Sequence, residues 1–228
     1  MKPNLKLAEA STPDGARLTL HEHDGTYCIR VNTEKLMHSS MHASELMLGE
    51  LAVAPLMSRA HPSVLIGGLG LGFTLKRVLE KLGPQSTVHV AELIPAVVTW
   101  NREFLSGLNG ALLDDPRVEI FSADVWDVIA QAGRARYDAV LLDIDNGPAA
   151  MVQKQNSRLY GRDGLERIAT VLKPGGRVVV WSAHPDAAFA QRLADAGFTV
   201  QVVAAKLHPN AKRPACTIFV ADRCGACR

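Results

Sequence analysis

The sequence predicts an α/β protein whose mainly parallel sheet is covered by helices on both faces, and three observations support this class. From Ser63 onward, apolar strand-like runs alternate with amphipathic, helix-like stretches. A glycine-rich turn at residues 67–72 separates the first of these strands from the first helix. The last two strand-like runs have no helical pattern between them. Alternating strands and helices imply parallel strands joined by crossover helices, whereas a direct link implies an antiparallel pair.

The individual elements follow from the apolar runs and their boundaries. We expect seven strands, at residues 63–66, 87–91, 118–122, 137–143, 176–181, 198–204 and 216–221. We expect helices at residues 73–82, 95–105, 124–132, 158–171 and 185–196. Pro95 suits the first turn of a helix, and the segment 173–176 ends the helix before it. The basic, turn-rich link 205–215 predicts that the last two strands form an antiparallel hairpin.

The segment ahead of the sheet carries its own pattern. Residues 17–31 alternate apolar and polar side chains around Asp24-Gly25, which predicts a short β-hairpin. Residues 43–59 then carry a helical apolar pattern that leads into the first strand of the main domain.

The composition excludes several classes of protein. The chain has 228 residues, of which 47% are hydrophobic and 21% charged, so it builds a sizeable core and is not disordered. A net charge of +2 gives no electrostatic case for nucleic acid. The first ten residues lack the apolar run of a signal peptide, and the longest apolar stretch, 46–57, is broken by Glu50 and Pro55. We therefore expect a cytoplasmic protein with no membrane partner.

The cysteines do not predict a structural role. Four cysteines are too few and too scattered for a disulfide framework. Cys224 and Cys227 form a single CxxC pair at the end of the chain, whereas zinc prefers four ligands. We expect no metal site.

The glycine-rich turn predicts a nucleoside site. Its glycines let the backbone approach a ligand closely, and the N–H groups at the following helix start suit a polar or anionic ligand. A second apolar strand ends about 20 residues later in Glu92, whose carboxylate suits the two ribose hydroxyls. The expected contacts are Gly67, Gly68, Leu69, Gly70, Glu92 and Leu93. The alternatives are a tight turn with no ligand and a dinucleotide site, whose GxGxxG spacing the turn does not match.

Asp143 is the candidate catalytic residue. It ends an apolar strand at the carboxyl edge of the predicted sheet, where such sheets bind ligands. A carboxylate there is suited to orient an acceptor amine and to take up its proton.

The chain resembles the spermidine synthase family, the aminopropyltransferases built on the class I methyltransferase fold, over residues 17–200. The resemblance rests on the opening hairpin, Ser44-Glu45, VLIGGLGLG at 64–72, Glu92, DPRV at 115–118, Asp124, YDAVLLD at 137–143 and LKPGG at 172–176. It implies a Rossmann-like fold with a seven-stranded, mainly parallel sheet, an antiparallel last strand and a small N-terminal β-hairpin. It also implies that Asp124, with Val125 beside it, contacts the adenine. Helix N-capping is the alternative for Asp124.

The resemblance also divides the chain and implies an assembly. Residues 1–60 form the N-terminal hairpin and the helix that follows it, residues 61–222 the S-adenosylmethionine-type nucleotide-binding catalytic domain, and residues 223–228 a tail. Family members suggest a homodimer.

Two departures from the family pattern shape the functional expectation. The glycine loop of the family usually reads GGGDGG, and its acid holds the free amine of decarboxylated S-adenosylmethionine; here that position is Gly70. Without that acid, the loop no longer repels the carboxylate of intact S-adenosylmethionine. The family motif D-S-x-D-P-x-G-P is shortened here to residues 143–148, which leaves Asp145 and Asn146 as acceptor-binding candidates together with His42.

We therefore expect a transferase that binds S-adenosylmethionine, or its decarboxylated form, and transfers a methyl group to a small polar, amine-bearing acceptor. Aminopropyl transfer of the spermidine synthase type is the first alternative. A nucleoside-binding regulatory module without catalysis is the alternative from another class.

Overall fold

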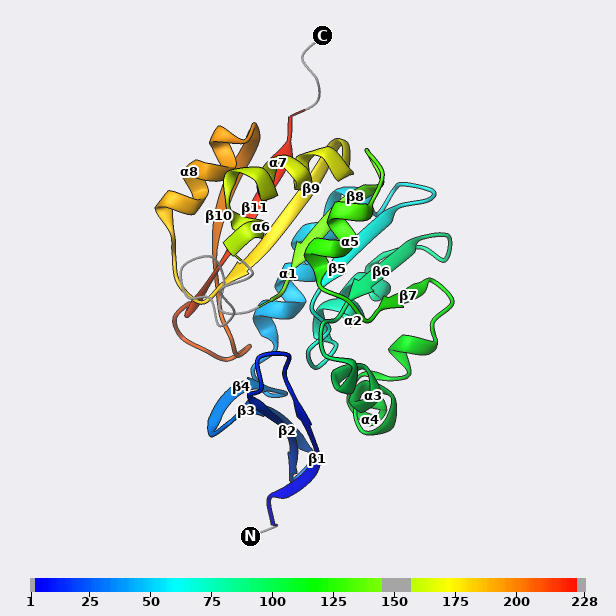
Figure 1. The fold of residues 1–228 in the computed structure, drawn as a ribbon, viewed down its shortest axis with the longest axis vertical. Helices are drawn as coiled ribbons and strands as arrows, with labels where there is room; N and C mark the ends of the chain where they lie inside the picture. Colours follow the sequence, from blue (N-terminus) through cyan, green and yellow to red (C-terminus); the bar gives the residue numbers. More distant parts are fainter. Residues whose placement is uncertain (1–2, 145–156, 225–228) are drawn as a thin grey trace.

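The computed structural model describes residues 3–144 and 157–224, which form two sheets with helices around the larger one (Figure 1). The smaller sheet is antiparallel and is formed by the N-terminal residues. In Figure 1 it lies below the larger sheet, next to the first helix. No helix in the described parts of the chain is long and apolar enough to cross a membrane.

The N-terminal sheet has four strands in sequence order. They are β1 (Leu5–Ser11), β2 (Arg17–His23), β3 (Thr26–Val31) and β4 (Glu34–His38). The predicted hairpin is β2–β3, and its turn residues Asp24 and Gly25 both have positive φ angles, 49° and 76°. The sequence pattern missed β1 and β4. Their residues are mostly exposed or half-buried, so their apolar alternation is weak.

The central sheet has seven strands in the order β10-β11-β9-β8-β5-β6-β7. Their bounds are β5 (Ser63–Gly67), β6 (Thr87–Ala91), β7 (Val118–Phe121), β8 (Tyr137–Leu142), β9 (Leu172–Ser182), β10 (Phe198–Ala205) and β11 (Cys216–Arg223). Strands β5 to β9 are parallel, and β11 is antiparallel to both of its neighbours. The predicted seven-stranded sheet and its antiparallel last strand are confirmed.

Helices cover both faces of this sheet, as predicted. One face packs against α1 (Ala43–Val53), α2 (Phe73–Lys81) and α3 (Pro95–Glu103), and the other against α5 (Val125–Gln131), α7 (Arg162–Val171) and α8 (Ala187–Asp195). Short helices lie between them: η1 (Ala54–Leu56), α4 (Ser106–Asn109), η2 (Leu112–Asp114) and α6 (Ser157–Tyr160). The first core also contains Leu18, Leu20 and Ile29, so the N-terminal sheet packs directly onto it.

Several boundaries differ from the expectation. The helix expected at 43–59 ends at Val53, because Pro55 cannot donate the N–H that an α-helix requires and a 3₁₀ turn follows. Strand β9 begins four residues before the expected 176, and its register on β8 shifts between Tyr137 and Ala139. The segment 172–176 therefore belongs to an irregular strand rather than to a turn.

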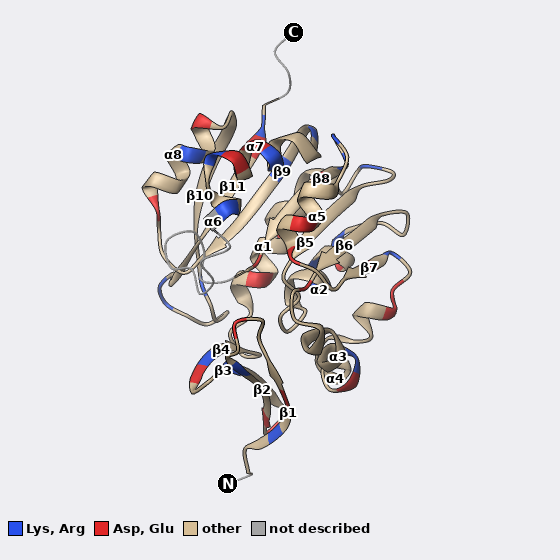
Figure 2. Ribbon diagram, in the orientation of Figure 1, with Lys and Arg blue, Asp and Glu red and all other residues tan. Residues whose placement is uncertain are grey.

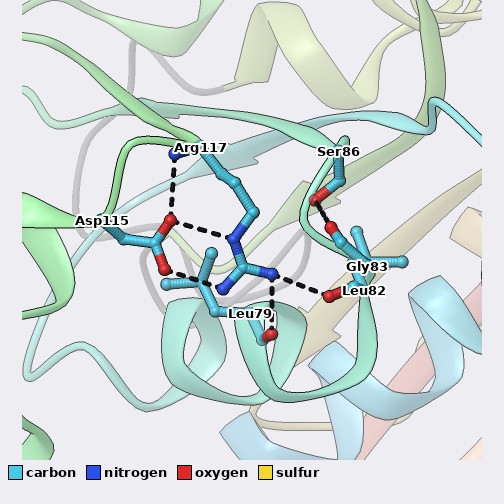
Figure 3. A network of polar contacts seen from close by, with 6 residues as sticks. All are labelled: Leu79, Leu82, Gly83, Ser86, Asp115 and Arg117. Atoms are coloured by element: carbon cyan, nitrogen blue, oxygen red, sulfur yellow. Dashed lines mark hydrogen bonds and ion pairs between the residues drawn. The ribbon is translucent and has the colours of Figure 1, made fainter.

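Two of the motifs behind the family resemblance have structural roles. Arg117 of the segment 115–118 donates to the carbonyl oxygens of Leu79 and Leu82, at 3.0 and 2.7 Å, at the end of α2 (Figure 3). Asp115 holds the guanidinium from the other side, with contacts of 2.9 and 2.7 Å. The guanidinium thus satisfies carbonyl groups that a helix end leaves without partners.

The motifs YDAVLLD and LKPGG are joined by an ion pair between β8 and β9. Buried Asp138 accepts from Lys173 at 2.6 Å, from Arg59 at 2.5 Å and from the backbone N–H of Ser63 at 2.8 Å. These partners lower the pKa of Asp138 against the opposing effect of burial. Asp138, the acid inside the YDAVLLD motif, therefore fixes the start of β5 rather than the ligand site.

Candidate functional site

A cavity of about 690 Å³ opens at the carboxyl ends of the parallel strands, where sheets of this type bind ligands. Its wall includes predicted residues from four separate segments: Gly68, Gly70, Glu92, Leu93, Asp124, Val125 and Asp143. Residues of β2, β3 and β4 complete the wall from the N-terminal sheet. The cavity thus lies where the two sheets meet.

The glycine loop lies tightly against the ends of the neighbouring strands. Gly68 has a φ of +90°, and a Cβ there would lie 2.3 Å from the carbonyl oxygen of Asp143. The Gly68 N–H donates to the carbonyl oxygen of Ala91 at 2.9 Å. Only glycine fits this position, because a side chain would collide with fixed backbone.

Two asparagines hold the outer part of the loop. The side-chain amide of Asn101 donates to the Gly70 carbonyl oxygen at 2.9 Å, and that of Asn109 donates to the Leu71 carbonyl oxygen at 2.5 Å. Both asparagines are buried. Sequence reasoning missed them, because their partners lie more than 30 positions away in the chain.

Glu92 is buried and braces the same loop. One carboxylate oxygen accepts from the Leu69 N–H at 2.9 Å, and the other accepts from the Ile94 N–H at 2.8 Å. Burial raises the pKa of Glu92, and the backbone N–H groups around it partly oppose that shift. These N–H groups orient the carboxylate at the cavity wall, and its contact with ribose hydroxyls stays a prediction.

Asp124 caps a helix and lines the cavity at once. One oxygen accepts from the Trp126 N–H at 2.8 Å at the start of α5, so the helix-capping alternative is present. The other oxygen accepts from Arg158 at 2.6 Å, and the Arg158 guanidinium lies 5.4 Å from the Trp126 ring centre. Contact of Asp124 with an adenine amine stays a prediction.

Asp143 is held by a hydroxyl and is joined by an acid that the sequence analysis had not placed in the site. The Thr74 hydroxyl, in the first turn of α2, donates to Asp143 Oδ2 at 2.6 Å. Burial raises the pKa of Asp143 to about 6. Glu45 of α1 lines the same cavity, and burial together with the charge of Asp143 raises its pKa to about 7.

Three further residues that we predicted to contact a ligand, Gly67, Leu69 and His42, are not part of the described cavity wall. A Cβ at Gly67 would lie 2.8 Å from Val125, and Leu69 is buried in the core, so both position the loop through packing. His42 bonds the Ser39 carbonyl oxygen at 2.7 Å and stacks on Phe73 with ring centres 4.4 Å apart. His42 therefore packs outside the described cavity wall, and its contact with an acceptor stays a prediction.

Other predicted positions lie outside the described residues. These are Asp145 and Asn146, the acceptor-binding candidates after β8, and Cys227 of the CxxC pair. Cys224 is an exposed free thiol.

The N-terminal sheet contributes Met37, which the sequence analysis also missed. A Cβ at Gly70, whose φ is +52°, would lie 2.7 Å from the Met37 sulfur. A thioether therefore occupies the space beside the loop position that carries an acid in the resembled family. The strand that supplies it, β4, has too weak a pattern to be predicted.

Comparisons with known proteins show what the chain is similar to. Polyamine aminopropyltransferase 1 of Streptomyces coelicolor is 37% identical over 138 residues, which cover 60% of this chain and 25% of the relative. A polyamine aminopropyltransferase of Aeropyrum pernix is 33% identical over 144 residues, which cover 60% of this chain and 43% of that protein. The chain thus spans less than half the length of these relatives. No family model matches the chain.

Solved structures show the same fold. A spermidine synthase from Thermotoga maritima superposes with a TM-score of 0.74 at 17% identity, covering 96% of this chain and 72% of that one. Human methyltransferase-like protein 13, in complex with SAH, gives a TM-score of 0.60 at 18% identity, covering 82% of this chain and 84% of that one. The class I methyltransferase fold and the resemblance to spermidine synthases are confirmed.

Proposed function

We propose that this relative of the polyamine aminopropyltransferases is a transferase that moves an aminopropyl group from decarboxylated S-adenosylmethionine to an amine acceptor. The observation that carries the proposal is the meeting of the glycine loop, Glu92 and Asp143 on one cavity wall. The relatives favour this reaction over the methyl transfer that Gly70 suggested from the sequence. Methyl transfer thus becomes the second candidate.

The residues of the cavity suit an in-line displacement. The amine nitrogen of the acceptor attacks the methylene carbon bonded to the sulfonium, and the C–S bond breaks with its electron pair moving to sulfur. The nitrogen must lose a proton, and Asp143 is placed to accept it. The Thr74 hydroxyl fixes the orientation of that carboxylate through its 2.6 Å hydrogen bond. Alignment of the two substrates supplies much of the rate.

Three observations on the cavity wall support an adenosyl donor site. Gly68 and Gly70 bring the loop backbone to the cavity wall without side chains of their own, and Glu92 lines the same wall. Gly70 is the observation that favours the second candidate, because the wall has no acid at that loop position. We therefore keep methyl transfer from intact S-adenosylmethionine as the reaction against which aminopropyl transfer is tested.

Ligand-induced stabilisation tests the donor. A ligand at 100 times its dissociation constant adds about 2.7 kcal/mol, which is about 5–11 °C in melting temperature for a chain of this size. We expect such a shift with methylthioadenosine and with the decarboxylated donor. S-adenosylmethionine and S-adenosylhomocysteine, the donor and product of methyl transfer, are measured for comparison. No shift with any of the four ligands would refute an adenosyl site.

Asp143→Asn separates binding from chemistry. Asparagine keeps the size of the side chain but accepts no proton, so we expect turnover to fall about 10²–10⁴-fold while donor-induced stabilisation changes little. Amines are screened as acceptors, and the released nucleoside identifies the transferred group: methylthioadenosine for aminopropyl, S-adenosylhomocysteine for methyl. Wild-type turnover in the variant would remove Asp143 from the mechanism, and no turnover with any acceptor would favour the regulatory module.

We also propose that the partners are small-molecule acceptors rather than nucleic acid or membrane, that the protein is cytoplasmic, and that it is a homodimer. The net charge of +2 supports the first point, and the family resemblance supports the last. Light scattering on the purified protein measures the mass, and a monomer at micromolar concentration would contradict the dimer.

A further inference from the structure

Glu45 reaches the same part of the cavity as Asp143, although almost 100 residues separate them in the chain. Glu45 lies in the first turn of α1, and Asp143 directly follows β8. Thr74 connects the two segments: its hydroxyl oxygen lies 2.6 Å from Asp143 Oδ2 and 3.4 Å from the Glu45 carbonyl oxygen. Because α1 packs on both α2 and β8, these three residues meet at a fixed point of the fold.

Among the residues that the structure describes, neither carboxylate has a cationic partner. Within the described residues, the only hydrogen-bond donors that act on them are hydroxyls and a backbone N–H, from Thr74 for Asp143 and from Ser44 and its own backbone for Glu45. The Ser44 hydroxyl lies 2.6 Å from Glu45 Oε2. Two half-buried acids with no compensating charge among the described residues destabilise the site, and a bound cation would relieve that cost.

We propose that Glu45 is an acceptor-binding residue that forms, together with Asp143, the anionic end of the cavity that holds the ammonium group of the amine acceptor. This inference rests on the proposed function. In the resembled family the second acid comes from the loop after β8, a segment that is shortened here. Glu45 supplies a second carboxylate from α1, the helix that joins the N-terminal sheet to the central sheet.

The charges around the pair agree with a cationic ligand. Among the described residues, the cavity wall carries five acids against one lysine, Lys35, and two histidines. The acids are Asp14, Glu45, Glu92, Asp124 and Asp143. Figure 2 shows acidic segments on α1 and beside β5 and α5 at the centre of the molecule. Behind the wall, the Cys216 thiol of β11 stays protonated at neutral pH, because burial raises its pKa to about 11.

The pair also balances the protons of the reaction. The bound ammonium transfers one proton to the pair and becomes a neutral amine. Its lone pair then forms the new C–N bond as the C–S bond breaks, which leaves a neutral thioether and a positively charged amine product. The sulfonium charge has passed to that product, and the proton on the pair leaves to solvent when the site empties.

The decisive experiment compares Glu45→Gln with Glu50→Gln in the full chain. Glu50 lies on the same helix, pairs with Arg77 and Lys81, and does not line the cavity. Melting temperatures are measured with saturating methylthioadenosine, with and without 1,4-diaminobutane. We expect the diamine to stabilise the wild type and Glu50→Gln further, and its affinity to fall at least about tenfold in Glu45→Gln.

Enzyme kinetics distinguish a binding role of Glu45 from a purely structural one. In Glu45→Gln we expect a higher KM for the diamine and an acidic limb of the pH–rate profile that shifts to lower pH. The shift follows because the variant lacks the higher of the two ionisations, that of Glu45 with a pKa of about 7, and keeps that of Asp143 with a pKa of about 6. An unchanged limb together with unchanged diamine affinity would overturn the inference.

The two proposals fail in different ways. If no adenosyl ligand stabilises the wild type, the proposed function fails at the donor. If methylthioadenosine stabilises all three proteins equally but the diamine has no effect on the wild type, or the same effect on Glu45→Gln, the role of Glu45 is refuted while the donor site stands. Should Glu45→Gln not fold, wild-type diamine binding is followed from pH 5 to 8, and affinity that does not rise with pH contradicts the inference.

Discussion

Among single residues, Glu92 combines a structural and a binding task that one substitution can separate. Its two oxygens accept backbone N–H groups of Leu69 and Ile94, so removal of the side chain would also release the loop. Glu92→Gln is therefore the better test, because its amide oxygen still accepts a hydrogen bond but the negative charge is removed. Adenosyl affinity should fall about 10- to 100-fold by calorimetry, because hydrogen bonds to a charged group contribute about 1.5–3 kcal/mol.

The matched control for this variant is Glu103→Gln, an exposed residue of α3. It should bind the ligand as the wild type does. Unchanged affinity in Glu92→Gln, with an unchanged melting temperature, would show that the carboxylate does not contact the ribose.

Gly70 is the residue that bears most directly on which donor binds. Aspartate tolerates a φ of +52° better than most residues, and Met37, which its Cβ would contact, is flexible. In Gly70→Asp, the ratio of affinities for decarboxylated over intact S-adenosylmethionine should rise at least about tenfold, because a carboxylate attracts an amine and repels a carboxylate. Gly70→Asn is the uncharged control. An equal affinity ratio in both variants would mean that the amine or carboxylate end of the donor does not lie beside residue 70.

At the scale of elements, the Arg117 network makes a prediction about stability alone. Arg117→Met removes the two hydrogen bonds to the end of α2 and leaves Asp115 without its partner. We expect a loss of about 1–3 kcal/mol, which is about 2–12 °C in melting temperature. Methylthioadenosine should still stabilise the variant by the wild-type increment, and Arg102→Met on the exposed side of α3 should melt as the wild type does. A variant that melts normally would remove the network from the stability of α2.

The elements show how far the sequence determined the fold. Strands β5 and β8 are buried throughout and read as continuous apolar runs, so the pattern located them within a residue or two. Strands β1 and β4 lie at the two edges of an exposed sheet, and their side chains are too mixed to show a period of two. Strand β9 begins early because Leu172 already pairs with Tyr137; the pairing with β8 then resumes at Arg177, after an irregularity over residues 173–176.

The candidate site was predictable only where local sequence determines it. Glycines after β5 and acids after β6 and β8 follow from the rule that ligands bind at the carboxyl ends of parallel strands. Glu45 and Met37 did not follow, because neither lies at a strand end of the central sheet. They enter the cavity through the packing of α1 and the N-terminal sheet on the main domain, which depends on tertiary contacts.

At the scale of the whole molecule, the buried acids link stability to pH. In the folded protein the pKa of Glu45 is raised to about 7 and that of Asp143 to about 6. Both groups ionise near pH 4–5 in the unfolded chain. Their contribution to the stability of the folded protein is therefore fully present below about pH 4–5. It is lost as the pH rises through their pKa values in the folded protein. Asp115 and Asp138, whose pKa values are lowered, act in the opposite direction and at lower pH.

Glu45→Gln removes one of the two carboxyl groups whose ionisation destabilises the folded protein. The variant should therefore lose less stability than the wild type as the pH rises. We predict that the melting temperature of the empty variant, relative to the empty wild type, increases between pH 5 and pH 8. A difference of about 1.4 kcal/mol per pKa unit sets an upper limit of a few kcal/mol. Glu50→Gln should show no such rise, because its carboxyl has a lowered pKa and keeps its ion pairs across the range. Thermal melts at half-unit pH intervals give the comparison. A difference between Glu45→Gln and the wild type that stays constant with pH would mean that Glu45 is solvated and titrates normally, and the cavity would then lack the charge pair that we assign to it.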